Sequence, residues 1–201
     1  MQKIGLTGSI AVGKSFVCDV LRELGCHVLD ADKTSREVVE PGTVGLKQII
    51  ANFGDNVLLP DGTLDRKKMG AIVFADGGKR QVLNSIVHPL VIESQNNWIK
   101  TCEKDDPHGI AVIDAALMIE SGGYKRFDKL IVVWCEPAIQ LKRLMLRDDL
   151  SEIDAQQRID AQMPQDEKKR FADYLINTSD GFDRARYQTS AIVRALRMLN
   201  P

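Results

Sequence analysis

Apolar residues fall along the chain in two patterns, short continuous runs and stripes that repeat every three or four positions. The runs predict buried strands over residues 1–7, 26–30, 110–114, 130–135 and 172–177. The stripes predict helices, beginning with apolar side chains at positions 16, 17, 20, 21 and 24 and ending with the segment 182–199. Strands that alternate with helices indicate an α/β fold, here a five-stranded parallel sheet flanked by helices.

Residues 33–108 show helical stripes without a clear strand. Pro41-Gly42 separates the first helices, and Asp65 is a candidate N-cap for a helix that runs to Phe74. His88-Pro89 interrupts a longer stripe, and we expect a kink or a helix restart there. The block is too long for a simple crossover between strands. We therefore interpret it as a helical insertion that holds a second substrate.

The candidate chemistry begins at the end of the first apolar run. Gly8-Ser9-Ile10-Ala11-Val12-Gly13-Lys14-Ser15 has the spacing G-x-x-x-x-G-K-S and lies between a predicted strand and a predicted helix. This context is typical of a phosphate-binding loop, and the alternative is a chance glycine turn before a helix. Because the flanking elements agree with the motif, the sequence favours the loop of the P-loop NTPase fold.

Each position of this loop has a physical reason. Gly8 and Gly13 allow backbone conformations in which consecutive N–H groups, including those of Ala11 and Val12, point at one anion. The N-terminus of the next helix adds its partial positive charge at the same point. We expect Lys14 to contact the β- and γ-phosphates of ATP and the hydroxyl of the following serine, Ser15, to bind Mg²⁺.

Acidic residues follow two of the other predicted strands. Asp30 and Asp32 come at the end of the second run, where ligands of open parallel sheets bind. They are placed to reach a substrate, and the alternatives are a helix cap and a solvated turn. Asp114 ends the third run, where phosphate-loop enzymes commonly hold Mg²⁺. The alternative for Asp114 is a side chain that only hydrogen-bonds loop backbone.

Two arginines follow the fourth run. Arg143 and Arg147 are spaced i, i+4, so both guanidinium groups share one helix face. Two such groups suit a polyphosphate. The sequence leaves open the alternative of a solvated basic face paired with Asp148 and Asp149.

The segment 148–170 is polar and helical, with Ser151 as a plausible N-cap. We interpret it as a mobile lid that closes on ATP and excludes water. Arg158 is placed to reach the phosphates from this segment, whereas Lys168-Lys169-Arg170 is interpreted as a solvated face.

Composition bounds the function further. The 201 residues carry a net charge of −1, which argues against a general nucleic-acid binder. No apolar run approaches the roughly 20 residues of a membrane span, and the early first strand leaves no room for a signal peptide. The four cysteines show no metal-ligand spacing, and we expect Cys18, Cys26 and Cys135 to be buried thiols of a reducing, cytoplasmic protein.

The order of these motifs resembles that of the dephospho-coenzyme A kinase family over almost the whole chain. The phosphate loop alone indicates only a superfamily, whereas D-A-D after the second strand, H-P and R-x-x-x-R-D in this order are more selective. The matching segments are Gly5-Leu6-Thr7-Gly8, Val28-Leu29-Asp30-Ala31-Asp32, Val39-Glu40-Pro41-Gly42, Asp61-Gly62-Thr63-Leu64-Asp65-Arg66, His88-Pro89-Leu90, Gln140-Leu141-Lys142-Arg143, Arg147-Asp148, Arg158-Ile159 with Gln162, and Ala172-Asp173 with Ile176-Asn177.

The resemblance implies phosphorylation of the ribose 3′-hydroxyl of dephospho-coenzyme A by ATP with Mg²⁺. It implies a nucleotide-binding core of residues 1–32, 109–147 and 171–201, a CoA-binding insertion of residues 33–108 and a lid of residues 148–170. The implied roles are acceptor activation by Asp32, acceptor binding around His88 and at Leu117, binding of the ATP phosphates by Arg143 and Arg147, and adenine binding near Asn177. Lys14 and Arg147 would neutralise the transferring group.

The chain departs from the family pattern at three places. Ser9, Ala11 and Val12 stand in a loop that is usually richer in glycine, although their N–H groups still suit an anion. Phe16, in the ATP-binding segment, replaces the usual second hydroxyl residue after the lysine. Leu117 lacks the proline that often precedes it.

Two other functions compete with this interpretation. One is phosphorylation of another small metabolite, as in nucleoside monophosphate kinases. The other is a nucleotide-dependent switch, against which the chain lacks an N-K-x-D guanine signature and has a long helical insertion. We expect a monomer or a weak homo-oligomer that binds small-molecule substrates, without nucleic-acid or membrane partners.

Overall fold

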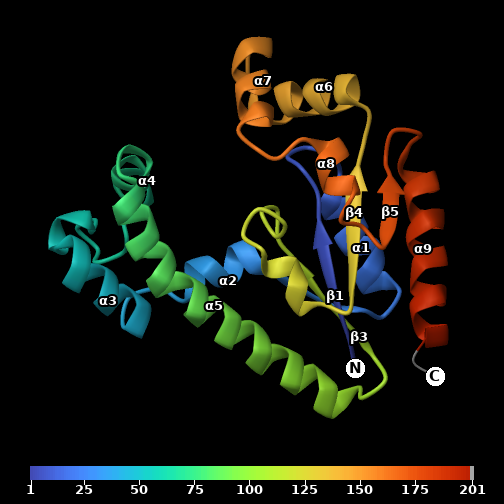
Figure 1. The fold of residues 1–201 in the computed structure, drawn as a ribbon, viewed down its shortest axis with the longest axis horizontal. Helices are drawn as coiled ribbons and strands as arrows, with labels where there is room; N and C mark the ends of the chain where they lie inside the picture. The colour runs from blue at the N-terminus through green and yellow to red at the C-terminus, as the bar shows by residue number, and fades with distance from the viewer. Residues whose placement is uncertain (200–201) are drawn as a thin grey trace. The chain divides into compact units, whose positions relative to one another are not determined.

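The computed structural model describes residues 1–199, and a five-stranded sheet in the order β2-β3-β1-β4-β5 organises it (Figure 1). Every pair of neighbouring strands is parallel, so the predicted α/β fold and its parallel sheet are confirmed. The strands are β1 Gln2–Thr7, β2 His27–Asp30, β3 Ile110–Asp114, β4 Lys129–Trp134 and β5 Tyr174–Asn177.

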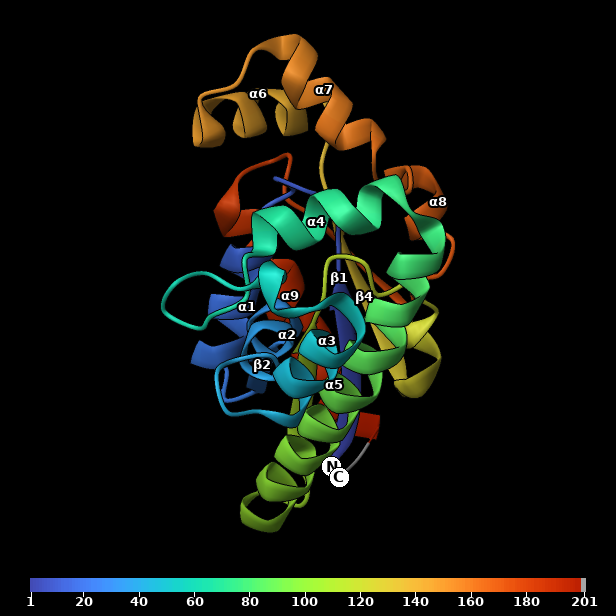
Figure 2. The same cartoon turned by 90° about the vertical axis from the view of Figure 1, so that its left-hand side faces the viewer.

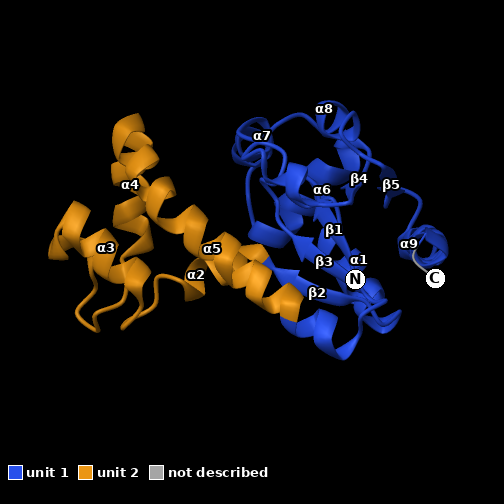
Figure 3. Cartoon of the chain, turned by 60° about the horizontal axis from the view of Figure 1, so that its bottom comes forward, with its two compact units in different colours: residues 1–30, 101–201 blue, residues 31–100 orange. Residues whose placement is uncertain are grey.

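The chain divides into two compact units, and each is described by itself (Figure 3). Unit 1 comprises residues 1–30 and those from 101 onward, and unit 2 comprises residues 31–100. The helices of unit 1 are α1 Lys14–Glu23, α6 Pro137–Asp148, α7 Glu152–Asp160, α8 Gln165–Lys169 and α9 Phe182–Leu199. Those of unit 2 are α2 Ala31–Glu37, α3 Val44–Phe53, α4 Arg66–Ala75 and most of α5 Gly77–Asp105. Short 3-10 helices cover Asp55–Val57 and Gly123–Arg126.

The core of unit 1 lies between the sheet and two helices. Helices α1 and α9 pack side by side on one face, and α8 lies on the other (Figures 1 and 2). The side chains of this core include Ile4, Leu6, Val17, Leu21, Val112, Ile131, Val133, Ile176, Val193 and Leu196. Each buried aliphatic side chain contributes about 1.5–3 kcal/mol through removal of apolar surface from water. This packing therefore holds the strands whose carboxyl ends carry the candidate residues.

The cysteines belong to the buried part of the protein. All four are free thiols, and Cys18, Cys26 and Cys135 are buried as predicted. Burial raises the pKa of Cys26 to about 11. A thiol of this kind stays protonated at neutral pH, so Cys26 packs as a small apolar side chain.

Unit 2 has a core of its own, formed by Val39, Ile49, Val57, Met69 and Ile86. The predicted cap at Asp65 is confirmed, because its side chain accepts a hydrogen bond from the N–H of Lys68 at 2.9 Å. We expected a kink or a helix restart at His88-Pro89, and the restart is wrong, since α5 continues through Pro89 as one helix of 29 residues. A proline removes one helical hydrogen bond, and the long helical segments on both sides of it outweigh that loss.

The prediction that Lys168 belongs to a solvated face is also wrong. Its side chain is 0% exposed, and its Nζ lies 2.8 Å from Glu120 Oε1 and 3.0 Å from the carbonyl of Ala116. Helix α8 packs against β4 and turns this one position of the basic run inward. The neighbouring Lys169 is partly exposed, with its Nζ 3.6 Å from the centroid of the Trp134 ring. The burial of Lys168 thus anchors α8 to the loop that follows β3.

Replacement of Lys168 by methionine should destabilise the protein strongly. Removal of one partner from a buried ion pair costs about 3–5 kcal/mol, and the part exposure of Glu120 places the expected loss at the lower end. Urea denaturation of Lys168→Met measures this loss. The matched control is Lys169→Met, which should change the free energy of unfolding by less than about 1 kcal/mol. Equal stability of the two variants would contradict the anchoring role.

Candidate active site

The phosphate-binding loop follows β1, and close contacts fix its ends. A Cβ atom on Gly8 would lie 2.5 Å from the carbonyl oxygen of Val133, so only glycine fits beside β4. Gly13 has a φ of 89° and is the N-cap of α1. Ala11 has a φ of 60°, a left-handed conformation that costs a non-glycine residue about 1–2 kcal/mol. The loop is therefore strained at Ala11.

Helix α1 begins directly after Gly13 and points its N-terminus at the loop. The first N–H groups of a helix have no intrahelical partner, so those of Lys14, Ser15 and Phe16 are available to an anion. No acidic residue lies in the first turn of α1 to compete for them. Ser15 is exposed, whereas Val12 is fully buried and anchors the loop in the core. The loop and the helix together offer a set of fixed N–H groups for phosphate.

The Lys14 ammonium is paired with the Asp114 carboxylate at the end of β3. Cys18 donates from its thiol to the other oxygen of Asp114, at 3.3 Å. Burial and the nearby Asp114 both raise the pKa of Cys18, which keeps this thiol a donor. Asp30 is the register partner of Asp114 on the neighbouring strand β2. The sheet thus brings Lys14, Asp30 and Asp114 to the same edge, as the sequence predicted from the strand ends.

Thr178, which directly follows β5, connects three parts of the site. Its hydroxyl donates to the carbonyl of Val12 in the loop at 2.7 Å. Arg143 donates to the Thr178 hydroxyl at 2.8 Å and to its carbonyl at 2.9 Å. Thr178 is not among the residues that the sequence singles out. The signal that would have found it is its position after a strand, next to the matched Ile176-Asn177 segment.

Aromatic rings complete this side of the loop. Phe16 and Phe182 stack with their centroids 4.5 Å apart, and the Arg143 guanidinium lies 5.4 Å from the Phe182 centroid. Asn177 holds this turn through its side chain, which accepts from the N–H of Ser179 at 2.8 Å. Arg143 is therefore positioned by Thr178 and Phe182 next to the nucleotide-binding loop.

Arg147 has a different environment from Arg143. It donates to both oxygens of Asp148, at 2.8 and 3.2 Å, and Arg158 of α7 donates to the same carboxylate at 2.9 Å. The hydrogen bonds from Arg147 lower the pKa of Asp148. Two arginines from α6 and α7 therefore share one acid. For Arg147, the structure matches the alternative that the sequence left open, a basic residue paired with Asp148. Arg143 differs, because it bonds to Thr178 instead.

The remaining predicted residues lie in both units. Leu117 is 54% exposed in the turn after β3, in unit 1. Asp32 lies in the first turn of α2, two positions after the last residue of β2, and His88 is exposed on α5. Both Asp32 and His88 belong to unit 2.

Two searches of the described residues bear on ligands and membranes. Residues 1–199 contain no group of three or more histidine, cysteine or acidic side chains that could hold a metal ion. Within the same range, the helices are too short or too polar to span a bilayer.

The family model described as dephospho-CoA kinase matches residues 2–183. The chain belongs to the dephospho-CoA kinase family. Its relatives in this family include the dephospho-CoA kinase of Shouchella clausii, 48% identical over 89% of this chain and 90% of that protein. Another is that of Listeria monocytogenes serotype 4b, 42% identical over 96% of both chains. The solved dephospho-CoA kinase of Campylobacter jejuni is 28% identical, with a TM-score of 0.73 over 99% of this chain and 98% of its own.

The close approach at Gly8 generates a prediction for this member of the family. Gly8→Ala forces a Cβ against the backbone of β4, which has no room to move inside the sheet. We expect a loss of about 1–3 kcal/mol in the free energy of unfolding.

Gly70→Ala on α4 is the control, because a Cβ there meets nothing within 4 Å. Alanine in a helix interior gains up to about 1 kcal/mol over glycine. Urea denaturation of both variants measures the difference, and a Gly8→Ala protein as stable as Gly70→Ala would contradict the packing argument.

Proposed function

We propose that this protein transfers the γ-phosphoryl group of ATP to the ribose 3′-hydroxyl of dephospho-coenzyme A, giving coenzyme A and ADP. The observation that carries the reaction is the match of the dephospho-CoA kinase family to residues 2–183. The phosphate loop, Lys14 and Arg143 at one edge of the parallel sheet support the nucleotide half of the reaction. The protein is thus a phosphotransferase of the last step of coenzyme A biosynthesis.

The transfer requires alignment and charge stabilisation more than covalent chemistry from the protein. We assign the triphosphate to the N–H groups of Gly8, Ala11, Val12, Gly13 and the start of α1, from Lys14 to Phe16. Lys14 leaves its pairing with Asp114 to contact the β- and γ-phosphates, and Arg143 and Arg147 neutralise the transferring group. Thr178 and Phe182 hold Arg143 for this role. Adenine binds near Asn177.

Mg²⁺ fits the residues at this edge. Magnesium prefers oxygen ligands, keeps several waters and is bound through one or two protein groups plus the substrate phosphates. The exposed Ser15 hydroxyl and the Asp114 carboxylate supply such oxygens beside the loop. We propose these two residues as its protein contacts. When bound there, the ion would supply positive charge to the phosphate oxygens.

Asp32 is the proposed acceptor-activating residue. Its carboxylate accepts the proton of the 3′-hydroxyl as that oxygen bonds to the γ-phosphorus and the bond to the ADP oxygen breaks. The insertion 33–108, around His88, together with Leu117, binds dephospho-coenzyme A. The segment 148–170 closes over ATP and excludes water, with Arg158 near the phosphates.

We also propose a cytoplasmic monomer or weak homo-oligomer. The four free cysteines of the described chain support a reducing compartment.

An acceptor screen tests the reaction. ADP release from ATP and Mg²⁺ should depend on dephospho-coenzyme A and remain at background with AMP, CMP, shikimate or gluconate. Preference for a nucleoside monophosphate would overturn the assigned acceptor. Slow ADP release that ignores every acceptor would instead favour a nucleotide-dependent switch.

Asp32→Asn tests the proposed base. The amide cannot take the proton, so kcat should fall by about 10²- to 10⁴-fold while the Kd for ATP changes little. Steady-state kinetics and titration calorimetry measure the two quantities. Asp19→Asn is the control, because Asp19 pairs with Arg22 on the exposed surface of α1, and this variant should keep the wild-type kcat. A wild-type kcat in Asp32→Asn would remove Asp32 from this role.

A further inference from the structure

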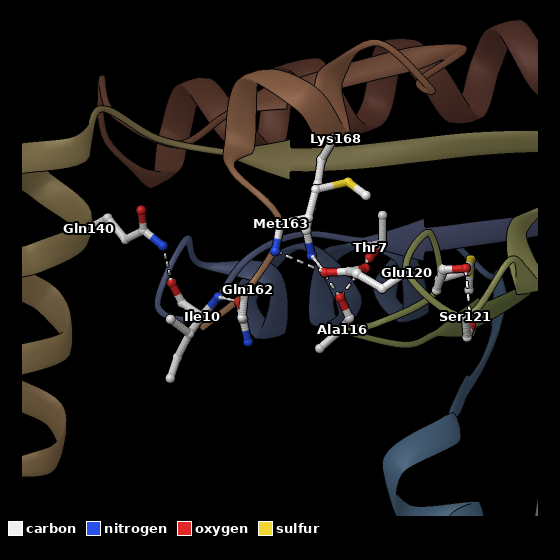
Figure 4. Close-up of polar contacts among 10 residues, drawn as sticks. Thr7, Ile10, Ala116, Glu120, Ser121, Gln140, Gln162, Met163 and Lys168 are labelled. Atoms are coloured by element: carbon white, nitrogen blue, oxygen red, sulfur yellow. Dashed lines mark hydrogen bonds and ion pairs between the residues drawn. The ribbon is translucent and has the colours of Figure 1, made fainter. Parts of the chain in front are cut away.

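Ile10 lies in the middle of the phosphate-binding loop, and glutamine side chains hold both of its backbone polar groups (Figure 4). Its N–H donates to Gln162 Oε1 at 2.8 Å, and its carbonyl accepts from Gln140 Nε2 at 2.8 Å. Gln162 comes from the segment between α7 and α8, and Gln140 from the start of α6. Neither glutamine has a role in the reaction proposed above.

The direction of these hydrogen bonds is set at both ends of a chain of amides. The N–H of Cys135 donates to Gln165 Oε1 at 3.1 Å, so Gln165 turns its Nε2 toward Gln140. That nitrogen donates to Gln140 Oε1 at 2.7 Å, which leaves the Gln140 nitrogen for the carbonyl of Ile10. A backbone N–H begins this series of hydrogen bonds and a backbone carbonyl ends it. Each side-chain amide therefore satisfies its hydrogen bonds in one orientation only.

The segment that carries Gln162 is itself anchored. The N–H of Met163 donates to Glu120 Oε1 at 3.4 Å, and the buried Lys168 binds the same oxygen at 2.8 Å (Figure 4). Lys168 also donates to the carbonyl of Ala116, which accepts from the Thr7 hydroxyl at 3.2 Å. The backbone next to Gln162 is therefore held in place by hydrogen bonds that lead to the end of β1 and to the loop after β3.

The residue after Ile10 explains why such a clamp is needed. Ala11 is held at a φ of 60°, and a strained backbone persists only where its surroundings over-determine it. The Gln140 bond to the Ile10 carbonyl fixes the peptide that enters Ala11, and the Gln162 bond to the Ile10 N–H fixes the peptide before it. The N–H groups beyond it bind an anion well only when they already point at one place.

We infer that Gln162 and Gln140 are positioning residues that hold the loop in its triphosphate-binding form. Through Gln162, the position of the 148–170 segment affects the affinity of the loop for ATP. The contacts that carry this inference all lie within unit 1. The inference rests on the proposed function only for the identity of the nucleotide.

The two glutamines present opposite groups to Ile10, and this allows a matched test. Gln162→Glu keeps an acceptor for the N–H of Ile10, whereas Gln140→Glu replaces a donor with an acceptor against a carbonyl. Both changes add the same negative charge. Gln157→Glu on α7 adds that charge at an exposed position and is the control. Both glutamines line a cavity of about 590 Å³; Gln140 is buried, and Gln162 is partly exposed.

The first measurement is the Kd of ATP by titration calorimetry on the full chain. Loss of the hydrogen bond to Ile10 should weaken binding about five- to tenfold in Gln162→Met. Gln140→Met should weaken it at least as much, because that variant also loses the bond from Gln165. Gln162→Glu should bind within about twofold of Gln157→Glu, and Gln140→Glu should bind at least about tenfold more weakly than Gln162→Glu. If Gln140→Glu does not fold, Gln140→Met supplies the comparison.

The second measurement is the KM for each substrate. A positioning role predicts that the weak variants raise the KM for ATP and leave the KM for dephospho-coenzyme A within about twofold, whereas a general loss of structure raises both. Wild-type affinity in both methionine variants, or equal weakening in the two glutamate variants, would overturn the inference. A wild-type protein that binds ATP without phosphorylating dephospho-coenzyme A would overturn the proposed function alone.

Discussion

The Lys14 ammonium and the Asp114 carboxylate are bound to one another, although 100 positions separate them in the chain. They meet because β1 and β3 are neighbouring parallel strands, and parallel strands deliver their carboxyl ends to one edge of the sheet. Thr178 reaches the same edge after β5 and touches the loop at Val12. The direction of the strands thus gathers Lys14, Asp114 and Thr178, from three distant segments, at one anion-binding loop.

Fixed backbone geometry is the second requirement of this site. Gly8 allows the loop to lie against β4, and Gly13 begins α1 with its N–H groups facing the loop. Ala11 is strained between them, and the amides of Gln140 and Gln162 hold the two peptides that flank Ile10. Rigidity at the loop is useful because preorganised N–H groups need no reorganisation when phosphate binds.

Most of the fold was predictable, because short apolar runs and helical stripes report burial directly. The five strands, the loop between β1 and α1 and the cap at Asp65 followed from local signals. Lys168 was not predictable, since a basic run looks solvated until the packing of α8 places one position inside. Thr178, Gln140 and Gln162 bind backbone groups far away in sequence, which residue type alone does not reveal. Gln140 and Gln162 stood in the family motifs, but without a physical role.

A crystal structure with a non-hydrolysable ATP analogue and Mg²⁺ would show where the triphosphate binds. We expect the β- and γ-phosphates on the N–H groups of residues 11–16, with Lys14 on the phosphates instead of on Asp114. We also expect the hydrogen bonds of Ile10 to Gln140 and Gln162 to persist. A triphosphate bound elsewhere, with the loop empty and Lys14 still paired to Asp114, would contradict this expectation.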